Sequence, residues 1–253
     1  MKKLFYLMLV AFSMFALLTG CTPKPPPPIP RLSQMRGQIA LLTLNPLPSI
    51  ASKVEDLGFN ALMPYSRIVF GWKGKLISIP NRSGVFLRFT SDEPDCRGHN
   101  PVQELAKYHS MKAETPDIPV GLVLCQDIGC GLGKKDEWIE VAKQVDFIAA
   151  GIYSWDKRWT EPDTIDEDAL KRSEEILDII REEIGDVPFV PILQAHWGFG
   201  DLVKPNVELQ VKFFLEQGYE GYIVYCWADE YNGVRDEQEE WEKWNKWFLS
   251  QIK

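Results

Sequence analysis

The sequence predicts an α/β barrel built from eight strands. Apolar segments rich in β-branched residues, typical of strands buried on both faces, alternate with amphipathic helical segments. Most strand segments end in polar or aromatic residues, as at the catalytic face of such barrels. About 215 residues follow the N-terminal segment, slightly fewer than the roughly 250 usual for a (β/α)8 TIM barrel. A doubly wound sheet is the alternative, but no glycine-rich phosphate motif follows the first strand.

Each element has its own signal in the sequence. Glycine and proline end several segments, and apolar side chains recur at helical spacing between them. Only residues 66–84 separate the second full strand from the strand that begins at Val85, so the second and third βα units are expected to be shortened. The predicted strands cover 38–44, 60–65, 75–80, the run from Val85, 119–125, 146–153, 188–193 and 221–226. The predicted helices cover 48–57, 101–114, 137–144, 166–184, 206–217 and 235–252.

The run from Val85 delivers the most conspicuous group of carboxylates. It begins as a buried strand and ends in Asp92-Glu93-Pro94-Asp95, where the proline stops strand pairing. Acids at the C-terminal end of a buried parallel strand are where α/β folds keep their chemistry. Capping of the helix that follows by Asp92 and Asp95 is the structural alternative. We take Glu93 as the first candidate catalytic residue.

The N-terminus resembles a bacterial lipoprotein signal. Lys2 and Lys3 precede an apolar run too short to span a bilayer, and Leu18-Thr19-Gly20-Cys21 is similar to a lipobox. The resemblance implies cleavage after Gly20 and lipidation of Cys21. We therefore expect a signal peptide over 1–20, a lipidated cysteine with a proline-rich linker over 21–36, and the barrel over 37–253. Thr22, in place of aspartate, favours the outer membrane if the host has one.

The charge and the cysteine content limit the kinds of partner and ligand that we expect. The net charge of −8, with no cluster of lysine and arginine, argues against nucleic acid as a partner. Export permits disulfides, and Cys96 and Cys130 both lie in loops just past strand ends, so we predict that they pair. The spacing of cysteine and histidine indicates no zinc site, and we expect no metal or other cofactor. We expect a monomer.

The predicted strand ends share one chemistry. Aromatic rings can stack on the apolar faces of sugars while carboxylates and amides bind the hydroxyl groups. In a barrel these ends converge on one face, which predicts a carbohydrate site there. The candidate residues are Asp92, Glu93, Asp127, Tyr153, Trp155, Gln194, His196, Trp197, Trp227, Asp229 and Glu230.

The strand ending in Asp92-Glu93-Pro94, together with Gly58-Phe59-Asn60-Ala61 before an earlier strand, resembles the (β/α)8 glycoside hydrolases. In their largest retaining clan the fourth strand ends in Asn-Glu-Pro, whose glutamate is the acid/base. The resemblance implies that Glu93 is the general acid and that Trp227 is the aromatic residue after the eighth strand.

The sequence departs from that clan at the end of the seventh strand. The clan places its glutamate nucleophile there, whereas this chain has Gln194, and a neutral amide cannot form the glycosyl-enzyme ester. Asp229 or Glu230 could supply the second carboxylate. Asp127 or Asp92 could instead act as base on a water molecule, or the barrel binds a glycan without cutting it. A purely structural envelope lipoprotein would leave the acids and rings unexplained.

Overall fold

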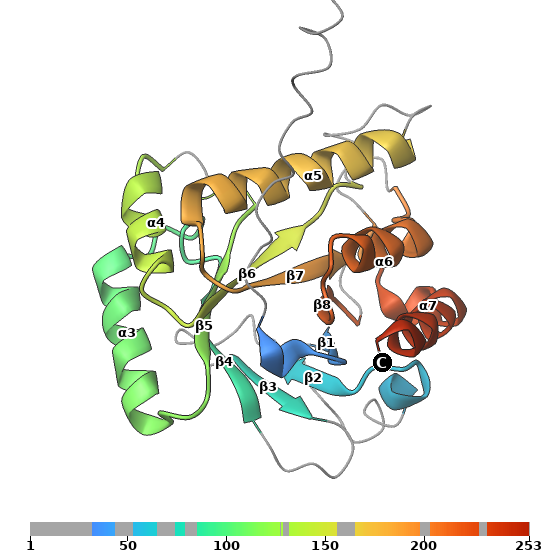
Figure 1. The fold of residues 1–253 in the computed structure, drawn as a ribbon, viewed down its shortest axis with the longest axis horizontal. Coiled ribbons are helices and arrows are strands. Elements are labelled where there is room, and N and C mark those ends of the chain that lie inside the picture. Colours follow the sequence, from blue (N-terminus) through green and yellow to red (C-terminus); the bar gives the residue numbers. More distant parts are fainter. Residues whose placement is uncertain are drawn as a thin grey trace, which may run out of the picture.

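A computed structural model describes residues 32–43, 53–64, 74–78, 85–126, 128, 132–155, 165–197, 203–227 and 232–252. Eight strands form a closed barrel in sequence order, with β8 pairing to β1 (Figure 1). The predicted eight-stranded α/β barrel is therefore confirmed. The strands are β1 (Ile39–Thr43), β2 (Ala61–Pro64), β3 (Gly74–Ser78), β4 (Val85–Asp92), β5 (Val120–Leu124), β6 (Phe147–Ile152), β7 (Phe189–Gln194) and β8 (Tyr222–Tyr225).

One strand runs against the other seven. β3 pairs antiparallel with β2 and with β4, whereas every other neighbouring pair is parallel. The physical reason is the length of the connections, residues 65–73 and 79–84, because a parallel crossover needs a dozen or more residues. The second and third βα units are short, as predicted. The expected all-parallel arrangement does not hold at β3.

Helices α3 to α7 follow one another around the barrel (Figure 1). They are α3 (Pro101–Glu114), α4 (Lys135–Ala142), α5 (Ile165–Ile184), α6 (Val207–Glu216) and α7 (Gln238–Gln251). The side chain of Asn100 caps α3 by accepting from Val102 N and Gln103 N, and that of Asn206 caps α6. Of the predicted helix over 48–57, residues 53–56 are helical and 48–52 lie outside the described residues. No helix of the described part is long and apolar enough to cross a membrane.

Alternation along the strands creates two cores. Side chains such as Phe89, Phe147 and Ile192 fill the barrel interior, while Leu122, Ile148 and Tyr222 pack between the strands and the helices. Near the centre, Phe147 packs against Gly121 so closely that a Cβ at position 121 would lie 2.8 Å from its ring atoms. The barrel is thus a packed core, and its two ends are left to carry polar groups.

We call the end where the parallel strands begin the floor, and the end where they finish the mouth. Met35 belongs to the interior core and is 4% exposed, so it plugs the floor just before β1. The chain is fixed there by Gly37 N, which donates to Glu220 O at 2.7 Å, and by the side chain of Asn60, which bonds Ile39 N and Gly37 O. The start of the described chain is therefore held at the floor.

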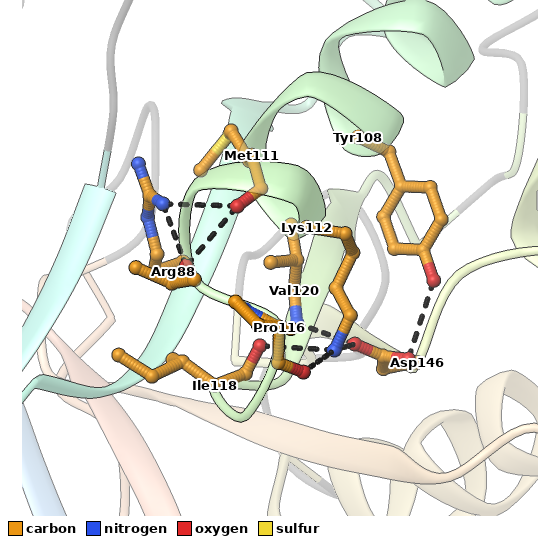
Figure 2. Close-up of polar contacts among 9 residues, drawn as sticks. Arg88, Tyr108, Met111, Lys112, Pro116, Ile118, Val120 and Asp146 are labelled. Carbon is orange, nitrogen blue, oxygen red and sulfur yellow. Dashed lines mark hydrogen bonds and ion pairs between the residues drawn. The ribbon is translucent and has the colours of Figure 1, made fainter.

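A polar network joins α3 to the floor ends of β5 and β6 (Figure 2). Asp146 accepts from Val120 N at 2.8 Å and from the Tyr108 hydroxyl at 3.2 Å, and it pairs with Lys112 Nζ at 3.0 Å. Lys112 also donates to the carbonyl oxygens of Pro116 and Ile118. Burial, and then the nearby Asp146, raises the pKa of Tyr108 to about 12, so its hydroxyl remains a donor at neutral pH.

Candidate active site at the mouth of the barrel

A β-bulge near the end of β4 sets the direction of its acids. Phe89 pairs with Gly121 and Asp92 with Val123, so β4 carries one residue more than β5 between these pairs. Ser91 faces outward, where its hydroxyl donates to Glu104 of α3 at 2.9 Å. The next residue, Asp92, is therefore directed to the interior side of the mouth.

Glu93 starts a tight turn in an uncommon backbone conformation. Its φ is +44°, and its amide donates to Val123 O at 2.9 Å. Its carbonyl then accepts from Cys96 N and Arg97 N, both at 3.1 Å. A side chain other than glycine in this region costs on the order of 1–2 kcal/mol. Such strained residues concentrate at functional sites, which is consistent with Glu93 as the first candidate.

The carboxyl of Glu93 has a raised pKa. Its side chain is 29% exposed. Burial is the largest cause that raises the pKa of Glu93 to about 7, and the negative charges of Asp92 and Asp95 add to it, while Arg97 opposes the shift. A carboxyl that titrates near 7 is half protonated at neutral pH, which suits a general acid.

Arg97 distinguishes the two neighbouring acids. Its Nη2 lies 2.7 Å from Asp92 Oδ2 but 3.8 Å from Glu93 Oε2, and its Nε donates to the backbone oxygen of Asp92 at 2.9 Å. The guanidinium therefore favours the ionised form of Asp92 over that of Glu93. In this pair Asp92 is placed to hold the charge and Glu93 to hold the proton.

Three rings meet on the interior side of the mouth. The Tyr153 and His196 rings are 4.9 Å apart, His196 and Tyr225 are 5.4 Å apart, and Tyr153 and Tyr225 are 5.9 Å apart. The Tyr153 ring folds back over Gly151, where any side chain would collide with it. Burial raises the pKa of Tyr153 well above its ordinary value, and the charge of Glu93 is the next cause, so phenol and carboxyl are near enough to interact.

Gln194 is a structural amide. Its side chain is fully buried, accepts from Trp155 N at 3.2 Å and donates to His196 O at 3.0 Å. Its backbone N and O bond the amide of Gln210 on α6, both at 2.9 Å. Gln194 thus joins the ends of β6 and β7. Trp155 is 1% exposed, so its ring packs inside the fold and offers no free face for a sugar.

Of the remaining predicted site residues, the structure describes two tryptophans. Trp197 is partly buried at the end of β7. Trp227 is partly buried against the core outside the barrel, and its amide donates to Leu42 O at 2.8 Å, so it extends the β1–β8 contact. The other candidates, Asp127, Asp229 and Glu230, lie outside the described residues. Among the described residues, no group of three or more His, Cys, Asp or Glu side chains could hold a metal ion.

The loop after β4 is tied to its neighbour. Asp95 is 1% exposed, and its two carboxylate oxygens accept from Cys125 N at 3.1 and 3.3 Å. Cys96 is disulfide-bonded, while Cys125 and Cys226 are thiols. Cys130 lies outside the described residues, so its pairing with Cys96 stays a prediction. These ties hold the turn that carries Glu93.

Sequence reasoning missed several parts of this site. Tyr225 and Arg97 were not among the candidates, and neither was the glycine under Tyr153. Tyr225 follows the interior residue Ile223 by two positions, so strict alternation along β8 would have placed it inside. The position of Arg97 depends on the turn after Glu93, and no pattern in the sequence indicates it.

No family model matches the sequence, and no curated protein matches it. Among solved structures, it is similar to active domain 2 of a thermostable chitinase from Pyrococcus furiosus, with 12% identity, a TM-score of 0.48 and coverage of 89% of this chain and 97% of that one. Bee venom hyaluronidase has 12% identity and a TM-score of 0.33 over 60% of this chain and 52% of its own. The PgaB (BpsB) glycoside hydrolase domain from Bordetella bronchiseptica has 15% identity and a TM-score of 0.34 over 56% and 41%.

Proposed function

We propose that this chain is a membrane-anchored protein that hydrolyses O-glycosidic bonds of a carbohydrate, with Glu93 as the general acid. The observation that carries the proposal is the carboxyl of Glu93, which sits at the end of β4 with a pKa of about 7. General acid catalysis needs a group that is protonated near the working pH and can then give up its proton to the leaving oxygen.

Asp92 and the three rings complete the proposed site. Asp92, held by Arg97, keeps a negative charge beside Glu93, and this charge would stabilise the positive charge that develops on the sugar ring. Tyr153 and Tyr225 are partly exposed, and they provide ring edges and hydroxyl groups that suit a carbohydrate, while His196 is 3% exposed and packs against both rings. Trp197 is the candidate stacking residue at the rim.

The mechanism needs a second catalytic group beside Glu93. Asp229 and Glu230 are candidates for the nucleophile or base from the end of β8, and Asp127 is a candidate from the end of β5. A substrate with an acetamido group beside the scissile bond offers a further route, because some glycosidases use that group as the nucleophile. This route is compatible with Gln194, because a substrate that supplies its own nucleophile requires no carboxylate from β7.

The test compares the wild type with Glu93→Gln on a panel of glycans with and without N-acetyl groups. The amide preserves shape but cannot donate the proton, so turnover should fall on the order of 10²–10⁴-fold while glycan binding is retained. The matched control is Glu182→Gln on the exposed face of α5, which should leave turnover unchanged. A Glu93→Gln rate equal to that of the wild type would reject Glu93 as the acid.

A second candidate is a glycan-binding envelope protein without catalysis. The observation that favours it is the buried amide of Gln194 at the position of the clan nucleophile, where its oxygen accepts from Trp155 N and its nitrogen donates to His196 O. Under this alternative the wild type binds glycans, measured by calorimetry, but releases no reducing ends from any glycan of the panel. Glu93→Gln would then change binding only.

The anchor is part of the same proposal. Lipidation of Cys21 would place the domain at the cell envelope, with the outer membrane as the expected destination where a host has one. Cys21→Ser should move the protein from the membrane fraction to the soluble fraction or stop its processing. Unchanged partition of that variant would show that another segment is the anchor.

A further inference from the structure

We infer that the floor of the barrel faces the membrane and that the mouth faces away from it, so that the site acts on glycan chains beyond the headgroups and not on saccharide headgroups of the same bilayer. This inference rests on the proposed anchor at Cys21. It adds an orientation and a class of substrate to the proposed function.

The first observation is that the residues just before β1 lie at the floor of the barrel. Met35 lies in the interior core at the floor, and Leu32 packs against the same cluster. The backbone around Met35 approaches Gly221 so closely that a Cβ at position 221 would collide with Met35 O. With the Gly37–Glu220 hydrogen bond of 2.7 Å, these contacts hold the root of the N-terminal segment beside the start of β8.

The second observation is that the proposed site lies at the other end. Asp92 and Glu93 follow β4, and Tyr153 and His196 follow β6 and β7, which are strands that run from floor to mouth. The eight-residue strand β4 runs from floor to mouth, and at about 3.3 Å per residue it is about 25 Å long, or about 20 Å along the axis of the barrel once its tilt is included. The root of the N-terminal segment and Glu93 are therefore separated by about the height of the barrel.

The third observation is the shortness of the chain between the proposed lipid anchor at Cys21 and Leu32 at the floor. Residues 21–32 can span at most about 40 Å, since each residue adds no more than about 3.3–3.6 Å. A mouth pressed against the bilayer would require about half of that length to pass along the side of the barrel before it reached the membrane. With the floor toward the bilayer the chain between Cys21 and Leu32 needs no such detour, so the shorter path favours this orientation.

The experiment uses the full lipidated chain in vesicles that carry an acceptor dye at the headgroups. A donor dye is attached through a non-natural amino acid, because the protein's own cysteines preclude thiol labelling. Leu132, 51% exposed after β5, reports on the mouth, and the exposed Asp117, just before β5, reports on the floor. A second pair, Val102 at the mouth and Asp186 at the floor, repeats the measurement at independent positions.

We expect energy transfer from the floor labels to be at least about twofold more efficient than from the mouth labels, because the two ends are about 20 Å apart. Equal transfer, or stronger transfer from the mouth, would overturn the inference. Insertion of a long Gly/Ser segment between Arg31 and Leu32 should bring the two efficiencies together, and a difference that persists would overturn the role of the short linker. Wild-type protein that does not bind vesicles would reject the anchor and the orientation together, whereas loss of hydrolysis in Glu93→Gln tests the chemistry alone.

Discussion

The floor and the mouth of this barrel place their carboxylates in opposite environments. At the floor, Asp146 accepts hydrogen bonds from a backbone amide and a tyrosine and lies 3.0 Å from Lys112 (Figure 2). At the mouth, Glu93 has a positive φ and a pKa of about 7, and the nearby Arg97 is 2.7 Å from Asp92 but 3.8 Å from Glu93 itself. The comparison indicates that Asp146 serves stability, whereas Glu93 is kept in a state that costs stability and permits proton transfer.

The largest stability effect is expected at the floor. Asp146→Ala removes the acceptor of Val120 N and the partner of Lys112, so the free energy of unfolding should fall by about 2–3 kcal/mol. Urea unfolding measures this change. Tyr108→Phe removes a single hydrogen bond of 3.2 Å and is the matched control, with an expected loss of about 1 kcal/mol or less. A loss below about 0.5 kcal/mol in Asp146→Ala would contradict the stabilising role of the network.

At the mouth, urea unfolding should show a gain in the free energy of unfolding when the carboxyl of Glu93 is replaced. Because the pKa of Glu93 is raised from 4.5 to about 7 in the folded protein, the folded state binds more protons than the unfolded state between these values. Stability is therefore lost as the pH rises through this window. Glutamine does not titrate, so Glu93→Gln should gain about 1–3 kcal/mol relative to the wild type between pH 4 and pH 8, with solvent screening lowering the value. A pH-independent difference would show that ionisation of Glu93 costs the fold nothing.

Arg97 allows a finer test of the mouth. Its positive charge lowers the pKa of Glu93, so Arg97→Gln should raise that pKa above about 7. Arg97→Lys keeps the charge but loses the two-point contact with Asp92, and it should produce a smaller rise. A carboxyl titration followed by NMR distinguishes the variants. A Glu93 pKa that is lower in Arg97→Gln than in the wild type would mean that the arginine acts chiefly through the shape of the turn.

The sequence predicts regular elements well and local irregularities poorly. The bounds of α3 were predicted to the residue because Asn100 caps its start and Pro101 occupies its first turn. The direction of β3 was not predicted, because it depends on the connection lengths and not on the strand's own pattern.

The site follows the same division. Placement of Glu93 at the end of a strand follows from the apolar run before it. The bulge between Phe89 and Asp92 and the positive φ of Glu93 leave no mark in a run of apolar and acidic residues. Similarly, the spacing that placed Gln194 at a strand end could not reveal that its amide accepts from Trp155 N, because that partner comes from the end of another strand through a tertiary contact.

The most direct test of the central claim is the pKa of Glu93 in the wild-type protein. Carbon-13 NMR of glutamate-labelled protein would follow the side-chain carboxyl between pH 3 and pH 9, with the signal assigned by its absence in Glu93→Gln. We predict a midpoint at about 7, with the carboxyl protonated below that pH and the proposed acid activity declining above it. A midpoint near the ordinary value of 4.5 would mean that Glu93 is ionised at neutral pH, and it would contradict its assignment as the general acid.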